Sequence, residues 1–116
     1  MNLQECYQAL GGDYEAVLGR LRSERMITKF VLKFLEDKSC EQLAAAVANR
    51  QGEEAFRAAH TIKGICQNLS FDRLYESSHA LAECLRGGWD DAAVALTEQV
   101  KADYQVTVEA IRQLEG

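Results

Sequence analysis

The chain lacks proline altogether and contains no long apolar run. None of its 116 residues is proline, and alanine, leucine, glutamate and glutamine dominate the composition. These residues favour helices, and the strongest helix breaker is missing. No stretch approaches the roughly 18 apolar residues of a membrane span, and the start MNLQECYQALGG has neither the basic beginning nor the apolar run of a signal peptide. We therefore expect an all-α protein without membrane insertion.

Cysteine is present but lacks the spacing of a disulfide framework or a metal site. The four cysteines stand alone at positions 6, 40, 66 and 84, with no CxxC pair and no histidine at ligand spacing. We interpret them as reduced core thiols of a cytoplasmic protein, and we expect no metal and no bound cofactor.

Positive charge is also scarce. The formal net charge is −5 and the isoelectric point is about 5.0. A surface that binds phosphate backbones needs clustered lysine and arginine that dominate their surroundings. The charge balance therefore argues against nucleic acid as a partner.

Turn-forming residues fall at helix-sized intervals, which indicates one compact helical domain over residues 1–116. From Ser39 the letters S-C-E-Q read as a capping box. The last four predicted helices form an up-down antiparallel four-helix bundle preceded by shorter N-terminal helices. Apolar periodicity predicts helices over residues 2–10, 13–21, 23–37, 39–51, 53–69, 71–85 and 90–114.

The helix predicted over residues 53–69 carries a histidine on its polar side. At about 100° per residue, its apolar residues form one continuous face, and His60 points away from that face. Periodicity alone leaves open that His60 is an ordinary surface histidine. The apolar residues are Ala55, Ala58, Ala59, Ile62, Ile65, Cys66 and Leu69, and the neighbours of His60 one and two turns away are Phe56, Arg57, Lys63, Gly64 and Gln67.

The neighbours of the histidine favour a reactive role. Gly64 costs roughly 1 kcal/mol relative to alanine in a helix, and its missing side chain would let a large partner reach the ring. Lys63 supplies an ammonium for a phosphoryl oxygen, Arg57 and Arg73 add positive charge nearby, and the amide of Gln67 can hold the ring or the phosphoryl group. A neutral imidazole is already a competent nucleophile and needs no dedicated base.

The segment AHTIKGICQNLSF, residues 59–71, closely resembles the central motif of histidine-containing phosphotransfer (HPt) domains. In that motif a histidine is followed by lysine at the third place and glycine at the fourth, and Asn68 also matches a common residue. The segments LGGDYEAVLGRL (10–21) and FVLKFLED (30–37) resemble the leading helices of the family. HALAECLRGGWDDA (79–92) is similar to the next helix and turn, so the resemblance covers residues 10–113.

The resemblance implies a phosphoprotein of two-component signal transduction, a phosphorelay intermediate without kinase activity of its own. His60 would accept a phosphoryl group from the aspartyl phosphate of a response-regulator receiver domain and pass it to another receiver. Lys63 would stabilise charge on the phosphoryl group, and the receiver would carry the Mg²⁺. The expected partners are receiver domains and a hybrid sensor histidine kinase, and the expected state is a monomer.

This sequence departs from the family pattern at two positions. Ser70 stands where the family often has glycine. Ala82 stands where some members have a glutamine that reaches the phosphohistidine, which leaves Gln67 as the local hydrogen-bond donor.

Other interpretations of the sequence stay open. A non-catalytic helical interaction module could use Phe56 in an apolar groove, with the neighbouring histidine incidental. An enzyme-like site at His79 or at the cysteines lacks a second acid, base or nucleophile placed to work with it. Direct phosphorylation by the catalytic domain of a histidine kinase is a variant within the family interpretation.

Overall fold

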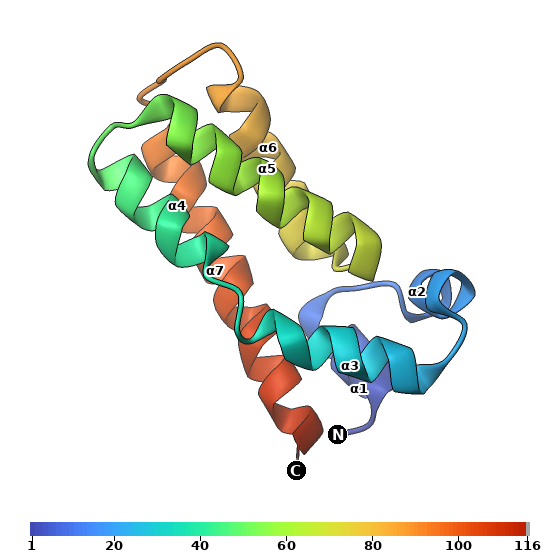
Figure 1. The fold of residues 1–116 in the computed structure, drawn as a ribbon. Coiled ribbons are helices and arrows are strands. Elements are labelled where there is room, and N and C mark those ends of the chain that lie inside the picture. The colour runs from blue at the N-terminus through green and yellow to red at the C-terminus, as the bar shows by residue number, and fades with distance from the viewer. Residues whose placement is uncertain (116) are drawn as a thin grey trace.

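The computed structural model describes residues 1–115, and all the regular structure within them is helical (Figure 1). This confirms the predicted all-α class. None of the described helices is both long and apolar enough to cross a membrane. The helices are α1 (Leu3–Leu10), α2 (Tyr14–Leu21), α3 (Glu24–Phe34), α4 (Ser39–Ala48), α5 (Gly52–Leu69), α6 (Asp72–Leu85), α7 (Ala93–Arg112) and the short 3-10 helix η1 (Gln113–Glu115).

The helices α4, α5, α6 and α7 form a closed ring in which each helix packs against two others. Each contacts the next in the chain, and α7 also contacts α4. The long helix α7 carries α4 along one half, while α1 and α3 pack along its other half (Figure 1). The molecule is accordingly elongated, with extents of 40 × 25 × 19 Å. The predicted helical bundle with short leading helices is confirmed, and the exact up-down order of its helices stays a prediction.

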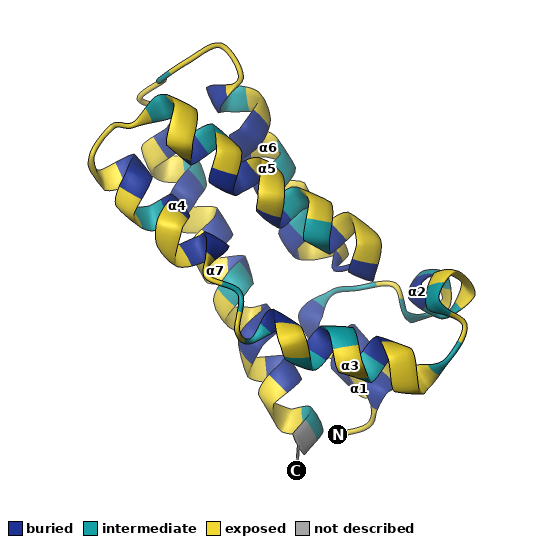
Figure 2. Ribbon diagram, viewed as in Figure 1, coloured by how far each residue is buried: buried dark blue, intermediate teal, exposed yellow. Residues whose placement is uncertain are grey.

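All seven α-helices contribute buried apolar side chains to one hydrophobic cluster. Figure 2 shows buried and exposed residues alternating around each turn, as amphipathic helices require. On α6, four residues at helical spacing are all buried, namely Leu74, Ser78, Leu81 and Leu85. The apolar face predicted for the helix over 53–69 is buried at every position except Ile65, which is half-buried.

The start of α4 differs from the prediction. The expected capping box at Ser39 is wrong, because Ser39 is already helical and the N-cap is Lys38, which makes no side-chain capping bond. A carboxylate oxygen of Asp37 instead accepts the backbone N–H of Ser39 at 3.0 Å. The preceding helix ends at Phe34 rather than at residue 37, which frees Asp37 for this contact. The described capping box lies in α1, between Asn2 and Glu5.

The N-terminal helices hold the C-terminal end of α5. Tyr7 Oη donates to the carbonyl of Leu69 at 2.7 Å, and Arg20 Nη1 donates to the carbonyl of Asn68 at 2.6 Å. These bonds satisfy carbonyls that a helix end leaves without partners. Ser70 then adopts the left-handed conformation, with φ of 57°, and caps α5. This conformation suits glycine best, which gives a physical reason for the glycine that the resemblance leads us to expect at position 70.

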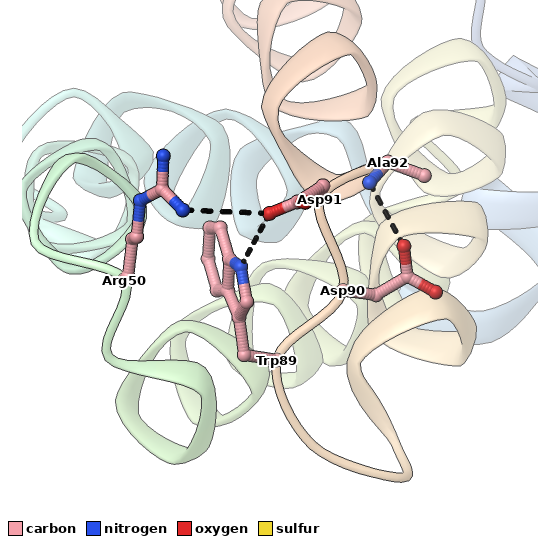
Figure 3. Close-up of polar contacts among 5 residues, drawn as sticks. All are labelled: Arg50, Trp89, Asp90, Asp91 and Ala92. Atoms are coloured by element: carbon pink, nitrogen blue, oxygen red, sulfur yellow. Dashed lines mark hydrogen bonds and ion pairs between the residues drawn. The ribbon is translucent and has the colours of Figure 1, made fainter.

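At the opposite end of α5, two connections meet (Figure 3). Asp91 Oδ1 accepts a hydrogen bond from Trp89 Nε1 at 2.9 Å and lies 3.6 Å from Arg50 Nη1. The α6–α7 connection thereby reaches the α4–α5 connection. The approach is close at the first residue of α5, since a Cβ on Gly52 would lie 2.7 Å from the backbone nitrogen of Trp89. Only glycine fits there without a backbone shift.

We expect Gly52→Ala to destabilise the fold by about 1–3 kcal/mol, because the added methyl meets backbone that cannot rotate away. Urea unfolding followed by the fluorescence of Trp89, the single tryptophan, measures the change at the contact itself. Gly87→Ala is the matched control, since a Cβ at Gly87 meets nothing within 4 Å. Equal unfolding midpoints for the two variants would contradict this account of Gly52.

Candidate functional site

His60 lies near the middle of α5 and is exposed to solvent. The face of α5 that packs inside the bundle is buried at Ala55, Ala59, Ile62 and Cys66. Because that face is committed to the core, the opposite face must point to solvent, and the imidazole points with it. The predicted orientation of His60 is therefore found in the structure.

Phe56, one turn before the histidine, supports the imidazole from the side. The rings of Phe56 and His60 are stacked with centroids 5.8 Å apart and planes 22° from parallel. Phe56 is itself half-buried and packs against the core. The guanidinium carbon of Arg86, at the end of α6, lies 5.3 Å from the centre of the Phe56 ring. An aromatic side chain thus connects the imidazole to a cation from the next helix.

The carboxylate of Glu83 on α6 holds Arg86 at two points. Arg86 Nε and Nη2 each donate to a carboxylate oxygen of Glu83 at 3.0 Å. These hydrogen bonds are the main reason that the pKa of Glu83 is lowered, and the nearby His79 and Lys63 act in the same direction. Lys63 is half-exposed, and its charge acts on Glu83 across the strip of surface between α5 and α6.

Gly64 faces open space. It is exposed, and a Cβ built on it would meet no atom within 4 Å, including the side chain of the histidine one turn away. Its φ is not in the positive range that favours glycine. Neither packing between helices nor backbone conformation within this chain explains the glycine.

Three of the remaining predicted residues have other contacts or none that reach the imidazole. Gln67 is exposed on α5. Arg57 is paired with Glu53 at 2.6 Å and lines a shallow hollow beside α4. Arg73 packs against Gly11 at the first turn of α6. The charges of these two arginines are therefore not gathered at the histidine.

Neither Asn68 nor Ala82 points into the surroundings of the imidazole. Asn68 is exposed and lines a groove of about 270 Å³ with side chains of α3, including Phe30 and Lys33. Ala82 is completely buried, so its side chain faces the core. On α6 it is Glu83 and Arg86 that reach toward the polar face of α5.

Sequence reasoning missed Arg86 and Glu83. Their spacing of three residues indicates an ordinary helix-surface ion pair. What makes them part of the site is the register of α6 against α5, which brings Arg86 over Phe56. No single-helix pattern contains that register.

The alternative site at His79 and the cysteines gains no reactive arrangement in the structure. The ring of His79 is stacked on Tyr75 with centroids 5.7 Å apart, and its Nδ1 is buried without a partner among the described residues. Cys6, Cys40 and Cys66 are buried free thiols, and Cys84 is half-buried. Residues 1–115 contain no group of three or more potential metal ligands.

A helical bundle that presents an imidazole to solvent from the middle of a long helix is suited to exchanging a group with another macromolecule. The family model described as "Hpt domain" matches residues 31–114, most of the chain. The chain therefore belongs to the Hpt domain family. Hpt domains are histidine phosphotransfer intermediates of phosphorelays, not kinases, and they interact with receiver domains. Neither the curated proteins nor the solved structures gave a match.

We expect the core thiols to resist modification in the folded protein. Burial raises the pKa of Cys6 to about 11 and raises the pKa values of Cys40 and Cys66 as well. At about pH 8 the reactive thiolate fraction is therefore small. A maleimide reagent followed by peptide mass mapping should label Cys84 first and the other three only after unfolding in urea. Rapid native labelling of Cys66 would contradict the buried assignment.

Proposed function

We propose that His60 accepts a phosphoryl group from the aspartyl phosphate of a receiver domain and passes it to a second receiver. The observation that carries this proposal is the exposed imidazole, with an aromatic support on one side and the open surface of Gly64 on the other. One proposed donor is the receiver domain of a hybrid sensor histidine kinase. The chain would act as a monomer that docks one receiver at a time.

In the proposed step, a ring nitrogen of His60 attacks phosphorus and forms the N–P bond. The bond between phosphorus and the aspartyl oxygen breaks, and the carboxylate leaves with the electron pair. The other ring nitrogen keeps its proton. By family analogy the receiver brings the Mg²⁺, so this chain supplies the nucleophile and a docking face.

Lys63 is proposed to stabilise charge on the transferred group. Lys63 is half-exposed and lies one turn from the histidine, and its ammonium would reach the equatorial oxygens of the transferred group. Gln67, one turn further on and exposed, is proposed to donate a hydrogen bond to the phosphoryl group. Asn68, Phe56 and Gly64 would belong to the docking face, and Arg57 would contribute from its edge.

Gly64 is proposed to provide clearance for the incoming receiver. A glycine in an exposed helix interior destabilises that helix, and among residues 1–115 no atom would lie within 4 Å of a Cβ on Gly64. A receiver that brings a carboxyl-bound phosphoryl group to the imidazole must place its own backbone within a few ångströms of α5. The empty surface beside the ring is where that backbone would fit.

We expect His60→Gln to abolish phosphoryl acceptance, because the amide that replaces the imidazole is not a competent nucleophile. The protein is incubated with phosphorylated receiver domain and examined by intact mass, and the adduct should be stable to alkali and labile to acid. Helix content and receiver binding should be nearly unchanged, since the side chain is exposed.

His79→Gln is the matched control, because His60 and His79 are the only two histidines. The control should still be labelled. Equal labelling of His60→Gln would defeat the phosphotransfer proposal and favour the non-catalytic interaction module.

We expect Gly64→Ala to raise thermal stability while slowing phosphotransfer. The added methyl improves helix propensity by up to about 1 kcal/mol, yet it obstructs the partner. Gly19→Ala on α2 is the control, since a Cβ there also meets nothing within 4 Å. Both variants should melt at higher temperature, and only Gly64→Ala should transfer more slowly in stopped reactions with phosphorylated receiver. Wild-type rates for Gly64→Ala would refute the clearance role.

A further inference from the structure

A continuous series of contacts connects the surface of α6 to the imidazole. Glu83 holds the guanidinium of Arg86 through two hydrogen bonds of 3.0 Å. The guanidinium lies over the ring of Phe56, at 5.3 Å from its centre. The Phe56 ring also stacks on the imidazole of His60, with the two ring centroids 5.8 Å apart. Four side chains from two helices are thus arranged in sequence.

We propose that Glu83 and Arg86 are positioning residues for His60, which act through Phe56 by holding its ring against the imidazole. This inference rests on the proposed role of His60 and adds residues that sequence reasoning did not identify. Glu83, Arg86 and Phe56 together form what we term the α6 clamp. The clamp restricts the rotation of the imidazole so that a ring nitrogen faces the incoming phosphoryl group.

The backbone supports the clamp at its outer end. Arg86 is the C-cap of α6, and its N–H donates to the carbonyl of Glu83 at 3.3 Å. A cation at a helix C-terminus is favoured by the helix dipole, and the two-point hydrogen bond defines the plane of the guanidinium. Phe56, at the inner end, packs against the core. Both ends of the clamp are therefore anchored. The exposed imidazole of His60 is the part that the clamp would orient.

A purely electrostatic role makes a different prediction for Glu83. If Glu83 and Arg86 acted only by their charges, removing the carboxylate would favour an approaching phosphoryl anion, and removing the guanidinium would disfavour it. The clamp predicts the same sign for both removals, because either one loosens the contact between the guanidinium and the Phe56 ring. The signs of the two rate changes therefore separate the two explanations.

The first measurement is the rate of phosphotransfer from a phosphorylated receiver to Glu83→Ala, Arg86→Ala and the double variant. We expect each single variant to transfer the phosphoryl group about two- to fivefold more slowly, which is the rate change that corresponds to the loss of an exposed cation–π contact. The double variant should be no slower than the slower single variant, since both act on one contact. A faster Glu83→Ala, or additive effects, would overturn the proposal.

Glu98→Ala on α7 is the matched control. Glu98 forms an ion pair of 3.2 Å with Lys101, three residues further along α7. This variant therefore removes a glutamate carboxylate from a similar pair on a helix surface. It lines a different surface, between α4 and α7. Its transfer rate should equal that of the wild type, and circular dichroism should show equal helix content for all variants.

The second measurement needs no phosphoryl group. Stacking places the ring protons of His60 in the ring current of Phe56, so their NMR shifts report the contact directly. In Glu83→Ala and in Arg86→Ala these shifts should move toward those of Phe56→Leu. Unchanged shifts in both variants would overturn the clamp. Moved shifts in a protein whose wild type accepts no phosphoryl group would refute the role of His60 and leave the clamp standing.

Discussion

The burial of one face of α5 is the constraint on which the rest of the site depends. That face lies among α4 and α6 in a closed ring of helices, and its small side chains, such as Ala55 and Ala59, allow close packing. A helix whose apolar face is committed in this way has a single rotational setting. The imidazole of His60 is exposed because the face opposite to it cannot leave the core.

Both ends of α5 are held by segments that lie far from it in the sequence. The carbonyls at its C-terminal end receive hydrogen bonds from Tyr7 and Arg20, in helices that lie before the matched family region. At its N-terminal end Gly52 permits the backbone of Trp89 to come close. The transfer proposed at His60 would benefit from a helix that does not shift along its axis. The N-terminal helices therefore support the site without forming part of it.

Two arginines, one on α5 and one at the end of α6, are paired with carboxylates on their own helix, although the chain is acidic overall. Arg86 is paired with Glu83, and Arg57 is paired with Glu53. Exposed pairs of this kind contribute little to the free energy of folding, because water and salt screen them. For Arg86 the effect is geometric, since its guanidinium is held at two points and keeps a defined plane. The charge of Lys63 acts on Glu83 from α5, across the same strip of surface.

Much of this protein could be predicted from the sequence by itself. The absence of proline and the spacing of apolar residues determined the helical class, the inward face of α5, and the outward direction of His60 with Lys63 and Gly64 beside it. These features depend only on the 3.6-residue repeat within one helix. Tertiary structure decided the rest: that Asp37 rather than Ser39 accepts a hydrogen bond from the first N–H of α4, and that Arg86 lies over Phe56. Such contacts depend on how one helix slides and turns against another, which no repeat within a single helix encodes.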